Sequence, residues 1–350
     1  MIRAGIIGAS GYAGAELVRY LLMHPGVEIT YLASGTYAGR PLSEAYPALL
    51  GRNLPDCSEY DLETAADAAD FFFQAQGNGV GMQVAPGLLE YGKKLVDVPA
   101  DFRIKDLAVY SAYYGAEHTA PDLVAEAIYG VPELRPEEIA AARIVANPGC
   151  YATAAILALA PLVKLGIVDS TSMIVDAKSG VSGAGRSKIE LSGMFCEINE
   201  GFRAYAVAGH RHTAEIEQEL GLLAGGELRV SFTPHLVPMN RGILATAYAG
   251  ARAGTQLPST AELLDTYRDF YADKPFVIVL EEGRQPNTKN VFGTNYCHIG
   301  LVADRRTGRA IVTCATDNMG KGAAGQAVQN MNLMCGFDED TGLACPAVYP

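Results

Sequence analysis

The 350-residue chain has little positive charge: 27 Lys and Arg stand against 39 Asp and Glu, which gives a formal net charge of −12. A protein without a basic excess has no long-range field that attracts a phosphate backbone or anionic lipids. We therefore expect neither a nucleic acid nor a membrane as its partner. An anionic small molecule has to be held by a few Arg or Lys residues placed close to it.

The chain also lacks closely spaced cysteine pairs and long apolar runs. Its seven cysteines include no CxxC pair, and an odd number at wide spacings argues against a zinc ribbon, a thioredoxin-like motif or a disulfide framework. The longest apolar run, from Ala154 to Val163, is about half of the roughly 20 residues that span a bilayer. The glycine-broken N-terminus does not resemble a signal peptide. We expect a cytoplasmic protein.

What the chain does have is enough apolar sequence, 49% of its residues, for buried cores, and its length predicts about two domains. In the first third, short apolar runs alternate with helix-like stretches, which is typical of α/β folds with a doubly wound parallel sheet. Beyond about residue 150 the segments become β-rich, which predicts an α+β domain with a mixed sheet.

A glycine-rich loop, GASGYAG at residues 8–14, follows the first predicted strand and opens the first predicted helix. This GxxGxxG variant of the dinucleotide fingerprint lets helix N-terminal N–H groups face a pyrophosphate, although glycines can also serve packing alone. Residues 32–40, at the end of the second predicted strand, contain no Asp or Glu to bind a ribose hydroxyl. Their hydroxyls and Arg40 suit a 2′-phosphate, or Arg40 is a solvated loop charge, and we predict NADP(H) as the cofactor. The candidate cofactor-binding residues are Gly8, Ser10, Gly11, Tyr12, Gly14, Ser34, Thr36 and Arg40.

The turn Asn147-Pro148-Gly149-Cys150 lies between a predicted buried strand and an apolar helix. It places Cys150 at a helix N-terminus, where unpaired N–H groups and the helix dipole stabilise a thiolate. A thiolate is the nucleophile that acyl transfer requires. A lone cysteine is more often a small buried hydrophobe, and we assign that role to the other six.

Three segments carry the acid/base groups and cations that such chemistry needs. Gly-His-Arg-His at 209–212 combines two imidazoles with a guanidinium, and without a third ligand it does not predict a metal site. Asp101-Phe102-Arg103 follows a strand at the edge where open α/β sheets bind ligands. Residues 176–186, DAKSGVSGAGR, carry Lys178 and Arg186 in a loop that is otherwise read as a flexible surface turn.

Together and in this order, these motifs and the tail DNMGKGAAGQAVQN at 317–330 resemble the N-acetyl-γ-glutamyl-phosphate reductases along the whole chain. The resemblance implies NADPH-dependent reduction of N-acetyl-γ-glutamyl phosphate, a small acyl phosphate, to N-acetylglutamate 5-semialdehyde and phosphate in arginine biosynthesis. It implies a Rossmann-type domain at 1–149 completed by a C-terminal helix within 318–350, a dehydrogenase-like catalytic and oligomerisation domain at 150–317, and a homodimer or homotetramer.

The resemblance also implies roles for single residues. Cys150 is the nucleophile that forms a thioester, and His210 is the acid/base, with His212 the second choice. Oxyanion stabilisation comes from the Cys150 backbone N–H or from Asn147. Gly35 and the segment 74–79 depart from the family pattern. Asn318 joins the cofactor-binding residues, and the candidate substrate-binding residues are Arg103, Asn147, Lys178, Ser179 and Arg211.

Two other interpretations stay open from the sequence. Aspartate-semialdehyde dehydrogenases and N-acetyl-aminoadipyl-phosphate reductases use the same thiol, imidazole and dinucleotide, so only the substrate pocket separates them. A regulator that binds a dinucleotide without turnover would keep the fold, but the joint presence of Cys150 and the Gly-His-Arg-His stretch argues against it.

Overall fold

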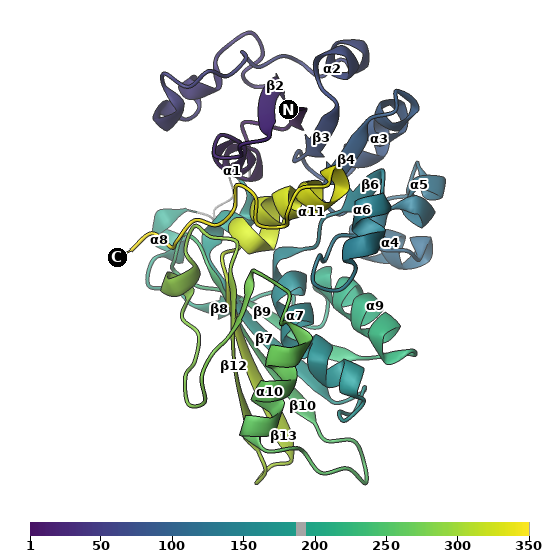
Figure 1. The fold of residues 1–350 in the computed structure, drawn as a ribbon, viewed down its shortest axis with the longest axis vertical. Helices are drawn as coiled ribbons and strands as arrows, with labels where there is room; N and C mark the ends of the chain where they lie inside the picture. Colours follow the sequence, from purple (N-terminus) through teal and green to yellow (C-terminus); the bar gives the residue numbers. More distant parts are fainter. Residues whose placement is uncertain (187–193, 350) are drawn as a thin grey trace. The chain divides into compact units, whose positions relative to one another are not determined.

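The computed structural model describes residues 1–186 and 194–349 (Figure 1). They form two compact units. The first consists of Met1–Pro148, the segment with Gly185 and Arg186, and Ala323–Cys345; the second consists of Gly149–Ala184, the described residues from 194 to Gly322, and the last few residues. Within the described residues, no helix has both the length and the apolar character to cross a bilayer.

The first unit is built on a parallel sheet whose strand order is β2-β1-β3-β4-β6-β5. The order runs outward in both directions from β1 and β3, so the crossovers reverse at that point, where ligands bind in open α/β sheets. The sheet confirms the predicted doubly wound Rossmann-type fold. Its strands are β1 (Ile2–Ile7), β2 (Val27–Ala33), β3 (Phe71–Gln74), β4 (Lys94–Asp97), β5 (Ile128–Tyr129) and β6 (Ile144–Ala146).

Strand β3 shows why this sheet forms. Phe71, Phe72 and Phe73 are all buried, and such a continuous apolar run is typical of a parallel strand covered on both faces. The described helices of this unit are α1 (Tyr12–Leu21), α2 (Leu62–Ala68), α3 (Gly81–Glu90), α4 (Leu107–Tyr114), α5 (Pro121–Glu126), α6 (Pro136–Ala141) and α11 (Gly325–Cys335), with 3-10 turns at Leu42–Glu44 and Pro47–Leu49.

Helix α11 brings the end of the chain back to the first unit. It packs against α1, α6 and β4, as the yellow helix in Figure 1 shows. Its buried face includes the amides of Gln329, Asn330 and Asn332, and each of them donates a hydrogen bond within the unit. The first unit therefore combines Met1–Pro148 with Ala323–Cys345, which lie far apart in the sequence.

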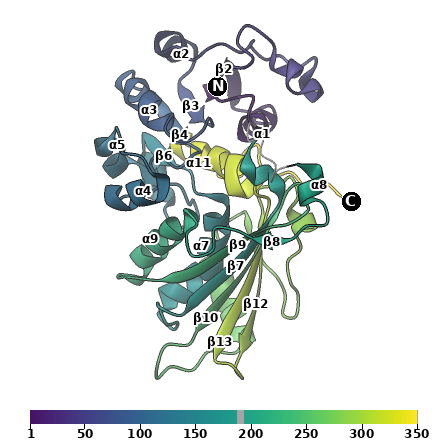
Figure 2. The same cartoon turned by 180° about the vertical axis from the view of Figure 1, so that it is seen from behind.

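The second unit carries a mixed sheet with the order β11-β12-β13-β10-β7-β9-β8 (Figure 2). Strands β7 and β10 alternate buried and half-buried residues, because helices cover only one face of the sheet. This arrangement confirms the predicted mixed sheet. Its strands are β7 (Met173–Ser179), β8 (Arg203–Ala204), β9 (Val230–Leu236), β10 (Ile243–Gly250), β11 (Val277–Val279), β12 (Cys297–Asp304) and β13 (Arg309–Thr316).

Helix α7 (Cys150–Leu165) is the centre of this unit's core: every residue from Tyr151 to Val163 is buried, and the helix packs on β10, β13 and α9. A helix that is apolar all round is stable only when it is enclosed in this way. The other described helices are α8 (Phe195–Ile198), α9 (His212–Ala224), α10 (Thr260–Phe270), a 3-10 turn at Val181–Ala184, another at Thr288–Val291 and a π-helical turn at Gly320–Ala324.

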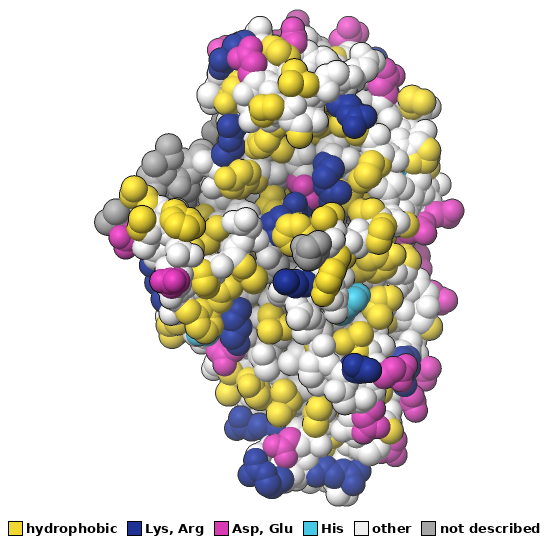
Figure 3. Space-filling model, turned by 90° about the vertical axis from the view of Figure 1, so that its left-hand side faces the viewer, with side chains coloured by type: hydrophobic (Ala, Val, Ile, Leu, Met, Phe, Trp, Pro, Cys, Tyr) yellow, Lys and Arg dark blue, Asp and Glu magenta, His cyan; other side chains and the backbone are white. Residues whose placement is uncertain are grey.

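The surface mixes charges of both signs. On the face drawn in Figure 3, Lys and Arg side chains occur in separate small groups among acidic and hydrophobic ones. Cations on this face therefore act locally, in keeping with the acidic balance of the whole chain.

Candidate functional site

The glycine loop of the first unit leads from β1 into α1 and has no room for side chains. Gly8 has a φ of 90°, and a Cβ atom there would lie 2.6 Å from the backbone nitrogen of Gln76. A Cβ on Gly14 would collide with the Gly8 carbonyl oxygen. Gly11 precedes α1 as its N-cap and supplies no side chain to the first-turn N–H groups. Those N–H groups suit the pyrophosphate of a dinucleotide.

The end of β2 lies next to this loop. The hydroxyl oxygens of Ser10 and Ser34 are 2.7 Å apart, so the structure brings these two predicted cofactor residues together. Arg40 donates from Nη2 to the Thr36 carbonyl oxygen at 2.6 Å and pairs through Nη1 with Glu44 at 3.1 Å. The charge of Arg40 is thus already offset by a carboxylate. Tyr12, at the start of α1, is 41% exposed.

Cys150 is the first residue of α7, as the sequence predicted. Its thiol is partly exposed and forms no disulfide. Gly149 precedes it as an N-cap with φ −66° and ψ 145° and offers no side-chain cap. The 16-residue helix therefore directs its dipole at the thiol, and both the dipole and the first-turn N–H groups favour the thiolate.

The cysteine turn is crowded on two sides, and glycine is needed on both. A Cβ on Gly322, in the π-helical turn, would lie 2.9 Å from the Cys150 Cβ. A Cβ on Gly149 would collide with the imidazole of His212. The Cys150 backbone and Cβ are therefore packed closely against Gly322, and the preceding Gly149 is packed closely against the His212 ring.

The two histidines lie together beside Cys150's neighbour Tyr151. The ring centroids of His210 and His212 are 4.6 Å apart, and those of Tyr151 and His210 are 5.6 Å apart. Burial, together with the positive charge of Arg211, lowers the pKa of His210 to about 4. The imidazole of His210 is therefore neutral near pH 7.

The proton of this neutral ring can be placed from its hydrogen bonds. The Nδ1 atom of His210 accepts the backbone N–H of His212 at 3.1 Å. The ring hydrogen of the neutral form then belongs on Nε2, an assignment that rests on the hydrogen bond. His210 presents an N–H donor at its outer nitrogen, and such a neutral imidazole can polarise a carbonyl group.

Two tyrosines complete the polar surroundings. The Tyr205 hydroxyl donates to the Tyr151 hydroxyl at 3.1 Å, and Tyr151 donates to the His235 carbonyl oxygen at 3.0 Å. Burial raises the pKa of Tyr205 to about 12, so its proton stays in place. Neither tyrosine was predicted from the sequence as a site residue, although Tyr151 directly follows the cysteine.

Glu215 anchors the cysteine turn from α9. Its side chain is fully buried, and its Oε2 atom accepts the Gly149 N–H at 2.9 Å while its Oε1 atom lies 3.8 Å from His212 Nε2. The spacing of three residues from His212 places both side chains on one face of α9. That spacing was the only sequence signal for Glu215, and the sequence analysis did not use it.

The predicted substrate-binding residues are divided between the units. Lys178, Ser179 and Arg211 belong to the second unit, where Ser179 ends β7 and Arg211 precedes α9. Lys178 donates to the Asp176 carbonyl oxygen at 3.0 Å, and burial lowers its pKa. Its ammonium group thus stays close to its own strand in this structure.

Arg103 and Asn147 belong to the first unit and are tied into it. Arg103 is 7% exposed and donates from Nη2 to the Val98 carbonyl oxygen at 2.7 Å. The Asn147 amide donates to the Ala323 carbonyl oxygen at 3.1 Å and accepts from Asn330 at 3.1 Å. Both the nitrogen and the oxygen of the Asn147 side chain thus take part in hydrogen bonds within the first unit.

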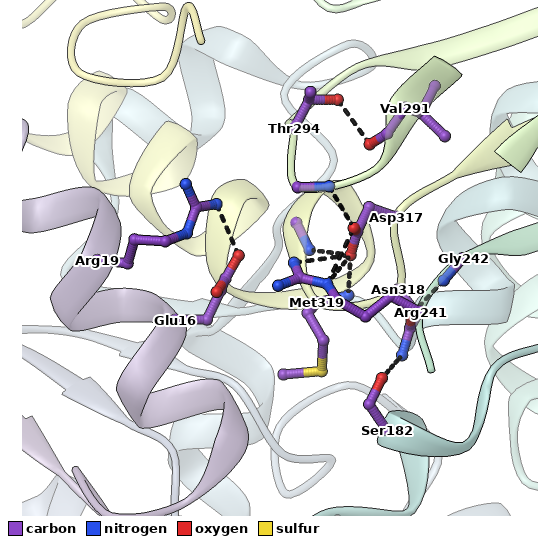
Figure 4. Close-up of polar contacts among 12 residues, drawn as sticks. Glu16, Arg19, Ser182, Arg241, Gly242, Val291, Thr294, Asp317, Asn318 and Met319 are labelled. Atoms are coloured by element: carbon purple, nitrogen blue, oxygen red, sulfur yellow. Dashed lines mark hydrogen bonds and ion pairs between the residues drawn. The ribbon is translucent and has the colours of Figure 1, made fainter. Parts of the chain in front are cut away.

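Asn318 also serves a structural purpose here. In the second unit its Oδ1 atom accepts the Gly242 N–H at 2.7 Å, and its Nδ2 atom donates to Ser182 at 2.9 Å, as Figure 4 shows. It therefore joins β10 to the turn after β7. Any role toward a cofactor is additional to this link.

Asp317 fixes the π-helical turn Gly320–Ala324, in which Gly322 lies against Cys150. Its buried carboxylate accepts from Arg241 Nε and Nη2 and from the backbone N–H groups of Gly293, Met319 and Gly320, at 2.6–3.1 Å (Figure 4). A carboxylate with this many donors fixes the start of the π-helical turn. The position of Gly322 against the thiol depends on it.

We expect Asp317→Asn to destabilise the protein by about 3 to 5 kcal/mol, because it leaves a partly buried guanidinium without its counter-charge. Urea unfolding followed by circular dichroism measures the change. Asp265→Asn is the matched control, since Asp265 pairs with Arg268 but is 71% exposed; its effect is expected to stay within about 1 kcal/mol. Equal losses for the two variants would contradict this assignment.

Comparison with known proteins gives a consistent result over the full chain. The family model "Semialdehyde dehydrogenase, NAD binding domain" matches residues 3–142, and "Semialdehyde dehydrogenase, dimerisation domain" matches residues 150–318. Proteins named N-acetyl-gamma-glutamyl-phosphate reductase from Pelotomaculum thermopropionicum and Desulforudis audaxviator are each 52% identical, over 100% of this chain and 99% and 100% of theirs. The protein of that name from Acetivibrio thermocellus is 50% identical over 100% of both chains.

Solved structures share the fold at much lower identity. Aspartate semialdehyde dehydrogenase II from Vibrio cholerae aligns with a TM-score of 0.72 at 18% identity, covering 96% of this chain and 98% of that one. Aspartate semialdehyde dehydrogenase with NADP from Candida albicans aligns with a TM-score of 0.71 at 18% identity and the same coverage. At this identity the likeness shows the fold alone.

Proposed function

The chain belongs to the semialdehyde dehydrogenase family, among its N-acetyl-gamma-glutamyl-phosphate reductases, and from this premise we propose that it reduces N-acetyl-γ-glutamyl phosphate with NADPH. The reaction consumes the acyl phosphate, NADPH and a proton, and yields N-acetylglutamate 5-semialdehyde, phosphate and NADP⁺. The observation that carries the proposal is a thiol at the N-terminus of α7, with the rings of His210 and His212 packed against its neighbours Tyr151 and Gly149, in a chain about half identical to proteins of that name.

Cys150 performs the first step. Its thiolate attacks the acyl carbon, the C–O bond to phosphate breaks with its electron pair leaving on phosphate, and a thioester remains on the sulfur. The dipole of α7 supports the anionic sulfur before the attack. After attack the negative charge passes to the carbonyl oxygen, which needs hydrogen-bond donors.

Two donors suit that oxygen: the Cys150 backbone N–H and the Nε2–H of His210. Because His210 is neutral, its ring donates a hydrogen bond without placing a second positive charge beside Arg211. After the thioester is reduced, the tetrahedral thiohemiacetal collapses, the C–S bond breaks, and the aldehyde is released with the thiolate restored. Any proton that the oxygen takes up or loses in this sequence passes through His210.

The residues of the first unit fit a dinucleotide. When bound, NADPH supplies the hydride that reduces the thioester carbon. The N–H groups at the start of α1 would hold its pyrophosphate, and Ser10, Ser34, Thr36 and Arg40 would surround the ribose end. The close packing at Gly8 and Gly14, which excludes side chains, supports this placement.

We further propose a homodimer or homotetramer assembled through the second unit, supported by the dimerisation-domain model that matches residues 150–318. Arg211 and Lys178 are the proposed holders of the substrate's anionic groups in that unit, with Ser179, the residue after Lys178 in β7, as a further contact. Arg103 and Asn147 would contribute from the first.

The test of the activity is the reverse reaction, in which NADP⁺ reduction is followed with N-acetylglutamate 5-semialdehyde and phosphate. We expect turnover that requires phosphate, because phosphate cleaves the thioester. Aspartate semialdehyde and the N-acetyl-aminoadipate semialdehyde should react far more slowly. Equal or faster turnover of either alternative would contradict the proposed substrate, and turnover without phosphate would contradict the acyl-phosphate product.

We expect NADPH to exceed NADH in kcat/KM by roughly tenfold to a hundredfold, because hydrogen bonds between charged groups and a 2′-phosphate contribute about 1.5 to 3 kcal/mol. Residues 32–40, at the end of β2, contain no Asp or Glu to favour a free ribose hydroxyl. Steady-state kinetics with the two reduced cofactors at one salt concentration measure the ratio. A ratio of one or less would rule out this cofactor preference.

A further inference from the structure

Arg186 belongs to the first unit although the preceding turn, Val181–Ala184, belongs to the second. Its Nη1 atom donates to the Ser10 carbonyl oxygen at 3.1 Å, and its Nη2 atom donates to the Tyr37 hydroxyl at 3.3 Å. The guanidinium thereby connects the glycine loop with the loop that follows β2. Arg186 and Ser10 are 176 residues apart along the chain, so local sequence patterns do not predict this contact.

Aromatic rings hold the guanidinium in place. Its central carbon lies 4.9 Å from the ring centroid of Tyr46 and 5.7 Å from that of Tyr37. The Tyr46 hydroxyl donates to the same Ser10 carbonyl oxygen, at 2.9 Å. A guanidinium stacked on aromatic rings is fixed in orientation while its remaining N–H groups stay able to bind an anion.

Arg186 and Arg40 differ in their ion pairing. Arg40 forms an ion pair with Glu44 at 3.1 Å. Among residues 1–186 and 194–349, no carboxylate pairs with Arg186, and tyrosines are its partners. In a chain with a net charge of −12, a guanidinium held without a counter-charge next to a phosphate-binding loop stands out as an anion site.

The position of Arg186 indicates which phosphate group of a dinucleotide it would bind. The glycine loop faces the pyrophosphate of a dinucleotide, and the end of the second strand faces the adenosine ribose. Arg186 contacts the Ser10 carbonyl oxygen in the glycine loop and Tyr37 in the loop after β2. The same Ser10 joins the end of β2 through its hydroxyl oxygen, which is 2.7 Å from that of Ser34. In this fold an Arg near the second strand accommodates a 2′-phosphate.

We propose that Arg186 binds the 2′-phosphate of the adenosine ribose, together with the hydroxyls of Ser10 and Ser34, and that it sets the preference for NADP(H). The inference rests on the proposed function in that the cofactor is a dinucleotide bound by the first unit. It gives Arg40, which the sequence analysis assigned to this phosphate, a secondary part. Glu44 competes with any anion for the Arg40 guanidinium.

Equilibrium binding of NADP⁺ and NAD⁺ tests the proposal without turnover, because the two ligands differ only in the 2′-phosphate. We expect isothermal titration calorimetry on Arg186→Gln to show NADP⁺ binding weakened roughly tenfold to a hundredfold, with NAD⁺ binding changed less than about twofold. Arg186→Lys keeps the charge but loses the planar fork, so an intermediate loss is expected. Arg52→Gln, at an exposed position of the same unit, is the matched control and should bind both ligands as the unaltered protein does.

Each outcome has a distinct meaning. If Arg186→Gln weakens both ligands equally, or neither, the 2′-phosphate assignment is overturned even though the unaltered protein prefers NADP⁺. If the unaltered protein itself shows no preference for NADP⁺, the proposed cofactor fails before the variant is considered. Should Arg186→Gln not fold, as judged by its circular dichroism, the ratio of the two affinities in Arg186→Lys decides the question.

Discussion

Cys150→Ala is expected to lower the phosphate-dependent rate of NADP⁺ reduction by at least about 10⁴-fold, because without the sulfur no thioester forms and the whole covalent route is lost. Binding of NADP⁺ should be unchanged, since Cys150 is not among the residues proposed to hold it. The measurement is the initial rate with the semialdehyde and phosphate, followed at the absorbance of the reduced nicotinamide. Cys196→Ala is the matched control, because Cys196 is an exposed thiol of the second unit and is expected to leave the rate unaltered.

The order in which cysteines are alkylated distinguishes a reactive thiolate from a thiol that is merely exposed. Cys196 is exposed and Cys150 only partly so, yet iodoacetamide at neutral pH should modify Cys150 first, because the N-terminus of α7 favours its thiolate. Mass spectrometry of the digested protein gives the order of labelling. Preferential labelling of Cys196, or substantial activity in Cys150→Ala, would contradict the assignment of Cys150 as the nucleophile.

The second large effect is expected for His210→Asn, which should lower kcat by roughly 10²- to 10⁴-fold through loss of the Nε2–H donor. Asn is chosen because its side-chain oxygen can still accept the His212 backbone N–H that the His210 Nδ1 atom accepts now. His212→Asn is the comparison. The His212 ring lies against Gly149, the residue before Cys150. If His212→Asn lowers kcat more than His210→Asn does, the acid/base role belongs to His212.

The pH dependence gives a separate check on His210. Its pKa is lowered from the ordinary 6.5 to about 4, first by burial and then by Arg211. Between these two values the unfolded chain binds more protons at this position than the folded one. The stability that His210 contributes is therefore fully present above pH 6.5 and is lost as the pH falls toward 4. The acid limb of kcat that His210 causes should likewise lie below pH 6.5, and a limb centred at 6.5 or higher that disappears in His210→Asn would contradict the neutral ring.

Local patterns in the sequence were enough to predict the two sheets and the cysteine turn. Two continuous apolar runs predict buried elements: Phe71–Phe73 forms a buried strand, and the stretch after Cys150 forms a buried helix. The GxxGxxG spacing likewise places the loop between β1 and α1. In these cases the determining contacts lie within a few residues along the chain.

The remaining parts of the site depend on contacts between distant segments. Arg40 looked available for a phosphate because the sequence does not reveal its ion pair with Glu44. Asn147 looked like a free donor, but Asn330, which is 183 residues away, and Ala323 engage its amide. Hydrophobic periodicity does not predict such hydrogen bonds, because the paired residues are distant in the sequence. They meet because α11 packs against the first part of the unit.

Short or weakly patterned helices were also beyond the sequence analysis. Helix α4 (Leu107–Tyr114) buries only Tyr110 along its length, so its apolar residues form no clear stripe. Its start is set by Asp106, whose carboxylate accepts the N–H groups of Ala108 and Val109 at 2.8 and 3.2 Å. An N-cap of this kind specifies where a helix begins, but an Asp alone predicts a turn as readily.

The contact between Gly322 and Cys150 has a consequence for efforts to make the protein more heat-resistant. Exchanging a helical glycine for alanine is a standard choice, since alanine narrows the unfolded ensemble at little cost to the fold. Gly322 would rank high on such a list, because it lies in a helical turn and its φ is not in the left-handed region. The added methyl group would lie 2.9 Å from the Cys150 Cβ. Gly322→Ala would therefore displace the proposed nucleophile even where it reduces the entropy of the unfolded chain.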